Sequence, residues 1–192
     1  MDVQHGSKKD SPILLEVSNM TNTCLRKLTT FICIALLCIF GVAQVAQAKV
    51  AVNIWNLMDS GEHLDYTNNS KYVVSVTTAV GWWNAYKKGV IRKDTSKTVN
   101  DVTMSHYSKK DGSIAITSPS GTLKFNSYYM SSLSEHNRIE VAAHEIGHAL
   151  GLSHNSSKTD IMHATSLDGD KLSKNDKESY DYAYWCNQVG RM

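Results

Sequence analysis

Three histidines, His144, His148 and His154, stand at a spacing that suits metal binding. On a helix, His144 and His148 lie one turn apart on the same face, about 6 Å along the axis. Gly151 can adopt the left-handed conformation that ends a helix and turns the chain back, which would bring His154 to the same ion. Imidazole suits Zn²⁺, which takes three protein ligands in catalytic sites and leaves one position for water. The pattern therefore predicts one catalytic Zn²⁺ site.

Glu145 directly follows the first predicted ligand. It would not bind the metal itself, but it would lie close enough to a metal-bound water to accept its proton as a general base. The alternative is a helix with scattered surface histidines, because the shorter pattern H-E-x-x-H also occurs by chance. The form H-E-x-x-H-x-x-G-x-x-H fixes five positions and favours the metal site.

This motif resembles that of the metzincin metallopeptidases, which place a methionine in a tight turn beneath the zinc. Met162 lies eight residues after His154, in the run T-D-I-M-H, and fits this Met-turn. The other reading of Met162 is an ordinary core methionine. Position 164 is alanine, whereas astacins and serralysins have a tyrosine there that approaches the zinc.

Within the metzincins, the sequence is most similar to the matrixins. The run G-H-A-L-G-L-S-H at residues 147–154, the short gap to Met162, and L-S-x-x-D at residues 172–176 carry this resemblance. It implies an α+β zincin fold, in which a mixed twisted sheet and about three helices position an active-site helix followed by the Met-turn. It also implies a zinc endopeptidase acting on protein or peptide substrates.

The resemblance further implies a substrate strand at the edge of the sheet, above the cleft, although an ordinary sheet strand is an equal reading. The residues concerned are Ser113, Ile114, Ala115, Ile116 and Thr117. An extended substrate would pair there by strand addition.

Two features depart from the matrixin pattern. The residues that usually line the specificity pocket are replaced by His163, Ala164 and Thr165, so no side-chain preference follows. His106 stands without the spaced partners of a structural zinc site. Calcium binding remains possible but unsupported, because Asp-Gly pairs are more often plain turns; the candidates are Asp111, Asp168 and Asp170.

The elements that must position these residues follow from hydrophobic periodicity. Strands are expected at residues 49–55, 101–107, 114–118 and 122–129, and helices at residues 73–88, 139–150 and from 173 onward. Residues 59–70 are polar and rich in turn formers. Gly89 should end the first helix, Ser134 should cap the second, and Ser173 with Asp176 should form a capping box on the third.

The N-terminal region has the layout of a secretory signal peptide. Arg26 and Lys27 precede an apolar run at residues 31–43, and the small-x-small sequence A-Q-A follows at residues 46–48. We expect a leader at residues 1–48, with Met20 as a possible true start, and one domain at residues 49–192. Cleavage would give a secreted protein, whereas an uncleaved segment would anchor the protein to the membrane.

Composition limits the remaining function classes. The 192 residues carry 20 basic and 18 acidic side chains, so the net charge is +2 and no concentrated basic run suggests nucleic-acid binding. Of the four cysteines, only Cys186 lies beyond the leader, so the mature chain forms no internal disulfide. We expect a monomer without stable membrane association once the leader is removed. An inactive domain that binds cell-wall or matrix ligands is the competing hypothesis.

Overall fold

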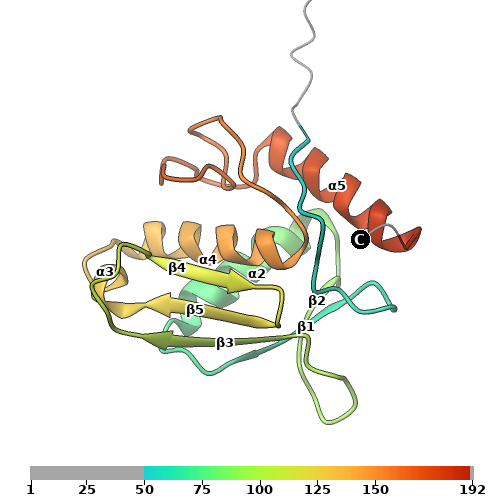
Figure 1. Ribbon diagram of the computed structural model, residues 1–192, viewed down its shortest axis with the longest axis horizontal. Helices are drawn as coiled ribbons and strands as arrows, with labels where there is room; N and C mark the ends of the chain where they lie inside the picture. Colours follow the sequence, from blue (N-terminus) through green and yellow to red (C-terminus); the bar gives the residue numbers. More distant parts are fainter. Residues whose placement is uncertain (1–49, 191–192) are drawn as a thin grey trace, which may run out of the picture. The chain divides into compact units, whose positions relative to one another are not determined.

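A five-stranded mixed sheet forms the centre of residues 50–190, the part of the chain that this computed structural model describes. The strand order is β2-β1-β3-β5-β4; β4 alone runs antiparallel and lies at one edge (Figure 1). The strands are β1 (Leu64–Asn68), β2 (Ile91–Lys93), β3 (Val102–Tyr107), β4 (Ala115–Ser118) and β5 (Thr122–Asn126). The predicted mixed sheet is confirmed.

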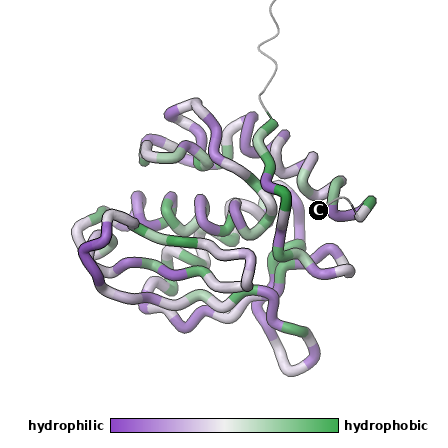
Figure 2. The backbone as a smooth tube through the Cα atoms, in the orientation of Figure 1, coloured by the Kyte–Doolittle hydropathy of each residue, from purple (hydrophilic) through white to green (hydrophobic). Residues whose placement is uncertain are grey.

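Two long helices pack against each other on one face of this sheet (Figure 1). The packed pair is α2 (Val73–Tyr86) and α4 (Glu135–Ala149). The other described helices are α3 (Ser127–Met130) and α5 (Lys174–Gln188). The turns of α4 alternate between hydrophilic and hydrophobic residues (Figure 2), as expected of a helix with one buried face. Trp83 of α2 is fully buried between them and donates its Nε1–H to the Ala143 carbonyl at 3.0 Å.

The predicted N-terminal caps of two helices are confirmed by their contacts. Ser134 accepts the Asn137 N–H at the start of α4, and Ser173 and Asp176 form a capping box at the start of α5. The predicted stop at Gly89 is not what ends the first helix: α2 ends at Tyr86, Lys87 already has an extended backbone, and Gly89 follows with a φ of 79° in the next turn.

The predicted strand at residues 49–55 is wrong over the described residues 50–55. Only Val52 makes an isolated bridge, and its partner is Leu152, outside the sheet. The alternation of apolar side chains does not bury one face, since Ile54 is 93% exposed. The segment instead hydrogen-bonds to the turn that follows α4.

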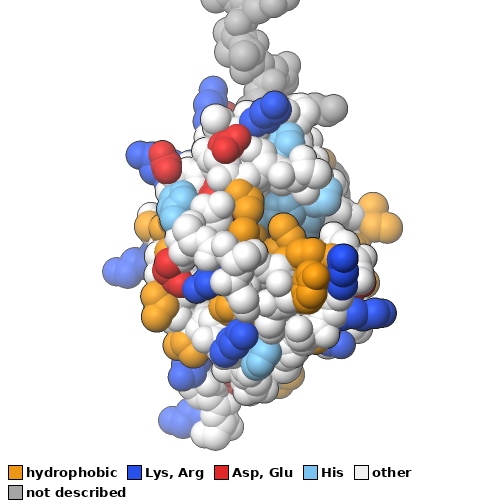
Figure 3. All heavy atoms as spheres, turned by 90° about the vertical axis from the view of Figure 1, so that its left-hand side faces the viewer, with side chains coloured by type: hydrophobic (Ala, Val, Ile, Leu, Met, Phe, Trp, Pro, Cys, Tyr) orange, Lys and Arg blue, Asp and Glu red, His pale blue; other side chains and the backbone are white. Residues whose placement is uncertain are grey.

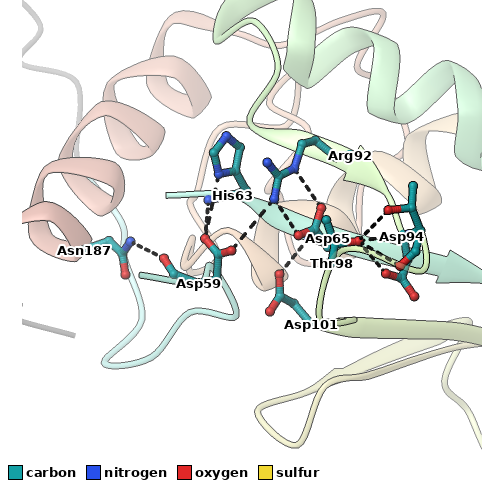
Figure 4. Close-up of polar contacts among 9 residues, drawn as sticks. Asp59, His63, Asp65, Arg92, Asp94, Thr98, Asp101 and Asn187 are labelled. Atoms are coloured by element: carbon teal, nitrogen blue, oxygen red, sulfur yellow. Dashed lines mark hydrogen bonds and ion pairs between the residues drawn. The ribbon is translucent and has the colours of Figure 1, made fainter. Parts of the chain in front are cut away.

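The sequence predicted the central strand β3 but missed the two strands on one side of it. The polar stretch at residues 59–70 contains β1, and β2 was not predicted at all. β1 was missed because a charged residue, Asp65, is buried in it. Its carboxylate receives two hydrogen bonds from Arg92 of β2, at 2.6 and 2.8 Å (Figure 4). The predicted strand at residues 122–129 ends early, because Asn126 caps the short helix α3.

The predicted signal peptide and the boundary at residue 48 lie outside the described residues. None of the helices described between residues 50 and 190 is both long enough and apolar enough to cross a membrane.

Candidate functional site

A sharp turn ends α4 and sends the chain back toward the helix. Gly151 has a φ of 94°, as its predicted role requires. The Gly151 N–H donates to the His148 carbonyl and the Leu152 N–H to the Gly147 carbonyl, both at 2.9 Å. These two bonds make a Schellman motif, which satisfies carbonyls at the helix end.

The segment before β1 holds this turn in place. The Asn53 N–H donates to the Gly151 carbonyl at 2.7 Å, and its Nδ2 donates to the Leu152 carbonyl at 2.9 Å. The Ser153 N–H donates to the Ala51 carbonyl at 2.9 Å. The position of the residue after Ser153 therefore depends on contacts about 100 residues apart in the sequence.

The structure brings the three predicted metal ligands together. His154 Nε2 lies 3.1 Å from His144 Nε2 and 3.1 Å from His148 Nε2. On the other side of each helical imidazole, Nδ1 contacts a backbone carbonyl: Ile161 at 2.8 Å for His144 and Leu152 at 2.9 Å for His148. These outer contacts fix the ring orientations.

This arrangement fits a cation. A carbonyl can only accept, so Nδ1 of His144 and of His148 carries the hydrogen and each Nε2 presents a lone pair. Burial lowers the pKa of His144 to about 3, with a further lowering from the nearby His148. Burial also lowers the pKa of His148. Neutral rings with converging lone pairs repel one another unless a metal ion lies between them, and nitrogen atoms about 3.3 Å apart suit tetrahedral Zn²⁺.

Met162 packs under α4, where the predicted Met-turn requires it. A Cβ at Gly147 would overlap the Met162 sulfur and lie 3.1 Å from Trp83 Cζ2. Gly147 is thus needed for the close approach of the turn to the helix. The turn also supplies the Ile161 carbonyl that orients His144.

Asp176 holds the Met-turn from the side of α5. Its buried carboxylate accepts the N–H groups of Ile161 at 3.0 Å and Met162 at 3.1 Å, besides that of Ser173 at 2.9 Å. The sequence indicated only the cap on α5. The contact with the Met-turn joins residues 14 and 15 positions apart across an irregular loop, which no local pattern reveals.

Glu145 is almost completely buried beside the histidines, with 6% of its surface exposed. Burial raises the pKa of its carboxyl to about 7, and a hydrogen bond from Thr117 opposes this rise. Thr117 Oγ1 donates to Glu145 Oε2 at 2.6 Å. The sequence analysis gave Thr117 no side-chain role.

A cleft of about 480 Å³ opens over these groups. All five predicted edge-strand residues line it, together with α4 and the segment that follows the Met-turn. The latter includes His163, Ala164 and Thr165, the residues that depart from the matrixin pattern. Figure 3 shows histidine side chains gathered in a hollow on the face that looks left in Figure 1. Both the metal ligands and Glu145 line the cleft.

The other acidic groups do not make a comparable site. Among the described residues, Asp59, Asp65 and Asp101 lie close together, but Arg92 pairs with Asp65 and lies 3.9 Å from Asp59 (Figure 4). A guanidinium thus already pairs with two of the three carboxylates. The structure does not bring the three calcium candidates together. His106 contacts the edge of the Tyr72 ring at 6.4 Å between centroids.

Solved structures that resemble this chain share little sequence with it. Archaemetzincin from Methanopyrus kandleri is 12% identical, covering 64% of this chain and 96% of its own, with a TM-score of 0.48. High choriolytic enzyme 1, a hatching enzyme zinc-protease from Oryzias latipes, is 14% identical, covering 69% and 95%, with a TM-score of 0.45. Myroilysin is 15% identical, covering 72% and 91%, with a TM-score of 0.47. No curated protein matches the chain by sequence.

The family model of the matrixins matches residues 58–185, which is 128 of the 192 residues. The match spans every strand, the helix with two of the histidines, the Met-turn and most of α5. The His triad can hold one zinc ion. The chain belongs to the matrixin family of zinc metallopeptidases.

Proposed function

We propose that this zinc metallopeptidase is a secreted endopeptidase that uses Glu145 as its general base. One observation carries the proposal. The Glu145 carboxylate and the three histidines line the same cleft, and the edge strand β4 forms a wall of it. Three metal ligands, a proton acceptor and a strand that can bind a peptide thus line one cavity.

His144, His148 and His154 would hold the metal. When bound, Zn²⁺ polarises a carbonyl and acidifies water at neutral pH. Glu145 accepts the proton of the attacking water and then delivers it to the departing amine. Its buried setting suits this role, because burial moves the pKa of the carboxyl toward neutrality, where it can both accept and release a proton.

The shape of the cleft supports an extended polypeptide as substrate. β4 pairs with β5 on one side only, so its other edge is free to hydrogen-bond a peptide strand. Such pairing is made with the backbone of the substrate and does not require a chain end, so it allows cleavage within a polypeptide chain.

Secretion is the second part of the proposal. It is supported by the basic-apolar-small layout of residues 26–48. Mass spectrometry of the protein recovered from the culture medium tests it, and Lys49 as the first residue is the expected result. A cell-bound protein that retains residues 31–43 would support the membrane-anchored alternative instead. Monomeric state stays a prediction.

The test of the general base is Glu145→Gln, with Glu178→Gln on α5 as the matched control. Glu178 is partly exposed, pairs with Lys174 at 3.5 Å and does not line the cleft. Removing the base should lower kcat on casein or an internally quenched peptide by about 10²- to 10⁴-fold. The zinc content should stay at the level of the wild type.

The control variant should keep the wild-type rate, and a chelator should abolish that rate. Full activity of Glu145→Gln would show that the assigned base is wrong. A wild-type protein that retains zinc and binds polypeptides without cleaving them would favour the inactive binding domain.

A further inference from the structure

The carboxylate of Glu145 is held by a side chain from the sheet. Thr117 of β4 points its hydroxyl at Glu145 Oε2, 2.6 Å away, and the same hydroxyl lies 3.1 Å from the Glu145 backbone carbonyl. Between residues 50 and 190, no other hydrogen bond to this carboxylate is found. We propose that Thr117 is a positioning residue that orients the general base toward the cleft. The inference rests on the proposed function of Glu145.

The hydrogen bond from Thr117 restricts the rotation of the Glu145 carboxylate. The terminal torsion of a glutamate side chain is broad, so an unpartnered carboxylate can turn its two oxygens over a wide range. A donor on Oε2 removes that freedom and leaves Oε1 to face the cleft. At 2.6 Å the bond is short, as expected of a hydroxyl that donates to a charged acceptor.

The donor, Thr117, is itself held rigidly in β4. Threonine is β-branched and therefore stiff at χ1. Thr117 sits in a strand, where it pairs with the fully buried Leu123 of β5. The neighbouring helix carries Glu145 itself, which is 6% exposed. The hydrogen bond thus joins two well-ordered elements rather than a mobile loop.

The strand that carries Thr117 also lines the cleft in which the substrate would bind. Side chains alternate across a strand, so Thr117 turns its side chain toward α4 while Ile116 turns to the other face and is exposed. The backbone of the same strand lines the cleft where a peptide would pair. One strand therefore sets both the path of the substrate and the orientation of the base.

A purely structural role is the alternative, because the hydroxyl also contacts the backbone of α4. The two roles differ in what they predict. A hydroxyl that only ties the strand to the backbone of α4 would stabilise the protein whether or not Glu145 is present and would leave kcat unchanged. A positioning residue acts through the Glu145 carboxylate and affects the turnover step. The test therefore separates kcat from KM and compares side chains that differ in the hydroxyl alone.

Thr117→Val keeps the shape of the side chain and removes its hydroxyl. We expect kcat to fall by about 10- to 100-fold, the effect of losing one hydrogen bond to a charged group, with KM within about threefold of the wild type. Thr117→Ser keeps the hydroxyl and should restore kcat to within about threefold. Ser120→Ala is the control, since Ser120 lies in the exposed turn beyond β4, does not line the cleft and should leave both constants unchanged.

A second readout needs no activity. In the zinc-free protein, Thr117→Val should lower Tm by several degrees, because the buried carboxylate loses its donor. In a Glu145→Leu background, the same change should have little effect on Tm, because the acceptor is gone. Equal losses in both backgrounds would mean that the hydroxyl does not act through Glu145 and would overturn the inference.

The kinetic outcomes separate the two proposals. If Glu145→Gln keeps full turnover, the general base is wrongly assigned and the role of Thr117 falls with it. If Glu145→Gln is inactive while Thr117→Val has the kcat of the wild type, only the inference about Thr117 is overturned. It is also overturned if Thr117→Ser is as impaired as Thr117→Val, or if the change raises KM alone.

Discussion

Two glycines in helix interiors should respond oppositely to the same substitution. Gly147 of α4 faces Met162 and Trp83, whereas Gly81 of α2 is exposed and has no atom within 4 Å of an added Cβ. At both positions, alanine favours the helix by about 1 kcal/mol relative to glycine. Only at Gly147 does the new methyl group enter an occupied space.

The magnitude follows from the contacts. A Cβ at Gly147 would overlap the Met162 sulfur and approach Trp83 Cζ2 at 3.1 Å. Trp83 is fully buried and is held by its bond to Ala143, so it cannot easily move aside. Because the new methyl group meets both a sulfur and an immobile indole ring, the upper part of the range for overpacking applies, about 2–3 kcal/mol, and the gain in helix propensity of about 1 kcal/mol offsets only part of it. We expect Gly147→Ala to lose about 1–2 kcal/mol, and Gly81→Ala to gain about 0.5–1 kcal/mol.

The assay is thermal unfolding of the zinc-free proteins, because bound metal would add its own stabilisation. For a domain of this size, Gly147→Ala should lower Tm by about 3–6 °C and Gly81→Ala should raise it by about 2–3 °C. Zinc affinity should fall only in Gly147→Ala, since the displaced turn carries the Ile161 carbonyl that orients His144. If Gly147→Ala is as stabilising as Gly81→Ala, Met162 does not pack beneath α4 as described.

Three further predictions concern other parts of the molecule. His154→Ala should reduce bound zinc below one equivalent by elemental analysis, and unchanged metal content would exclude the three-histidine site. Burial raises the pKa of Glu140, so this carboxyl loses its proton at a lower pH in the unfolded chain than in the folded protein. The folded protein therefore loses stability as the pH rises above about 4.5, the ordinary pKa of the group. Glu140→Gln should therefore gain in Tm over the wild type between pH 4 and pH 7, whereas a constant difference would contradict this reasoning. Arg92→Met should lower Tm because Asp65 stays buried without its partner, and adding Asp65→Asn should recover part of the loss; equal Tm values in all three proteins would show that the pair adds nothing.

The sequence predicted best where the chemistry is local. The spacing of His144 and His148, the turn at Gly151 and the capping box at Ser173 each depend on residues within one or two helical turns. Backbone geometry fixes such relations wherever the helix forms. The predicted ligand positions therefore agree with the structure, and the family match supports the zinc chemistry that they implied.

The predictions were wrong where the alternation of apolar residues along the chain does not correspond to a buried face of the sheet. Residues 50–55 alternate but pair with the turn after α4, outside the sheet. β1 does not alternate, because Asp65 is buried there and is neutralised by Arg92 of a neighbouring strand. Hydrophobic patterns assume that polar residues lie at the surface. They cannot anticipate that Asp65 is buried because Arg92, 27 positions later, pairs with it.

By itself, the sequence determined His144, His148, the adjacent glutamate and the helix that carries them, because these relations are set by the period of one helix. The position of His154 depends in addition on the contacts of residues 51 and 53 with the turn after α4. The tertiary structure alone decided that Thr117 contacts Glu145 and that Asp176 holds the Met-turn. Both contacts join separate elements, and their geometry depends on how the sheet, α4 and α5 pack together.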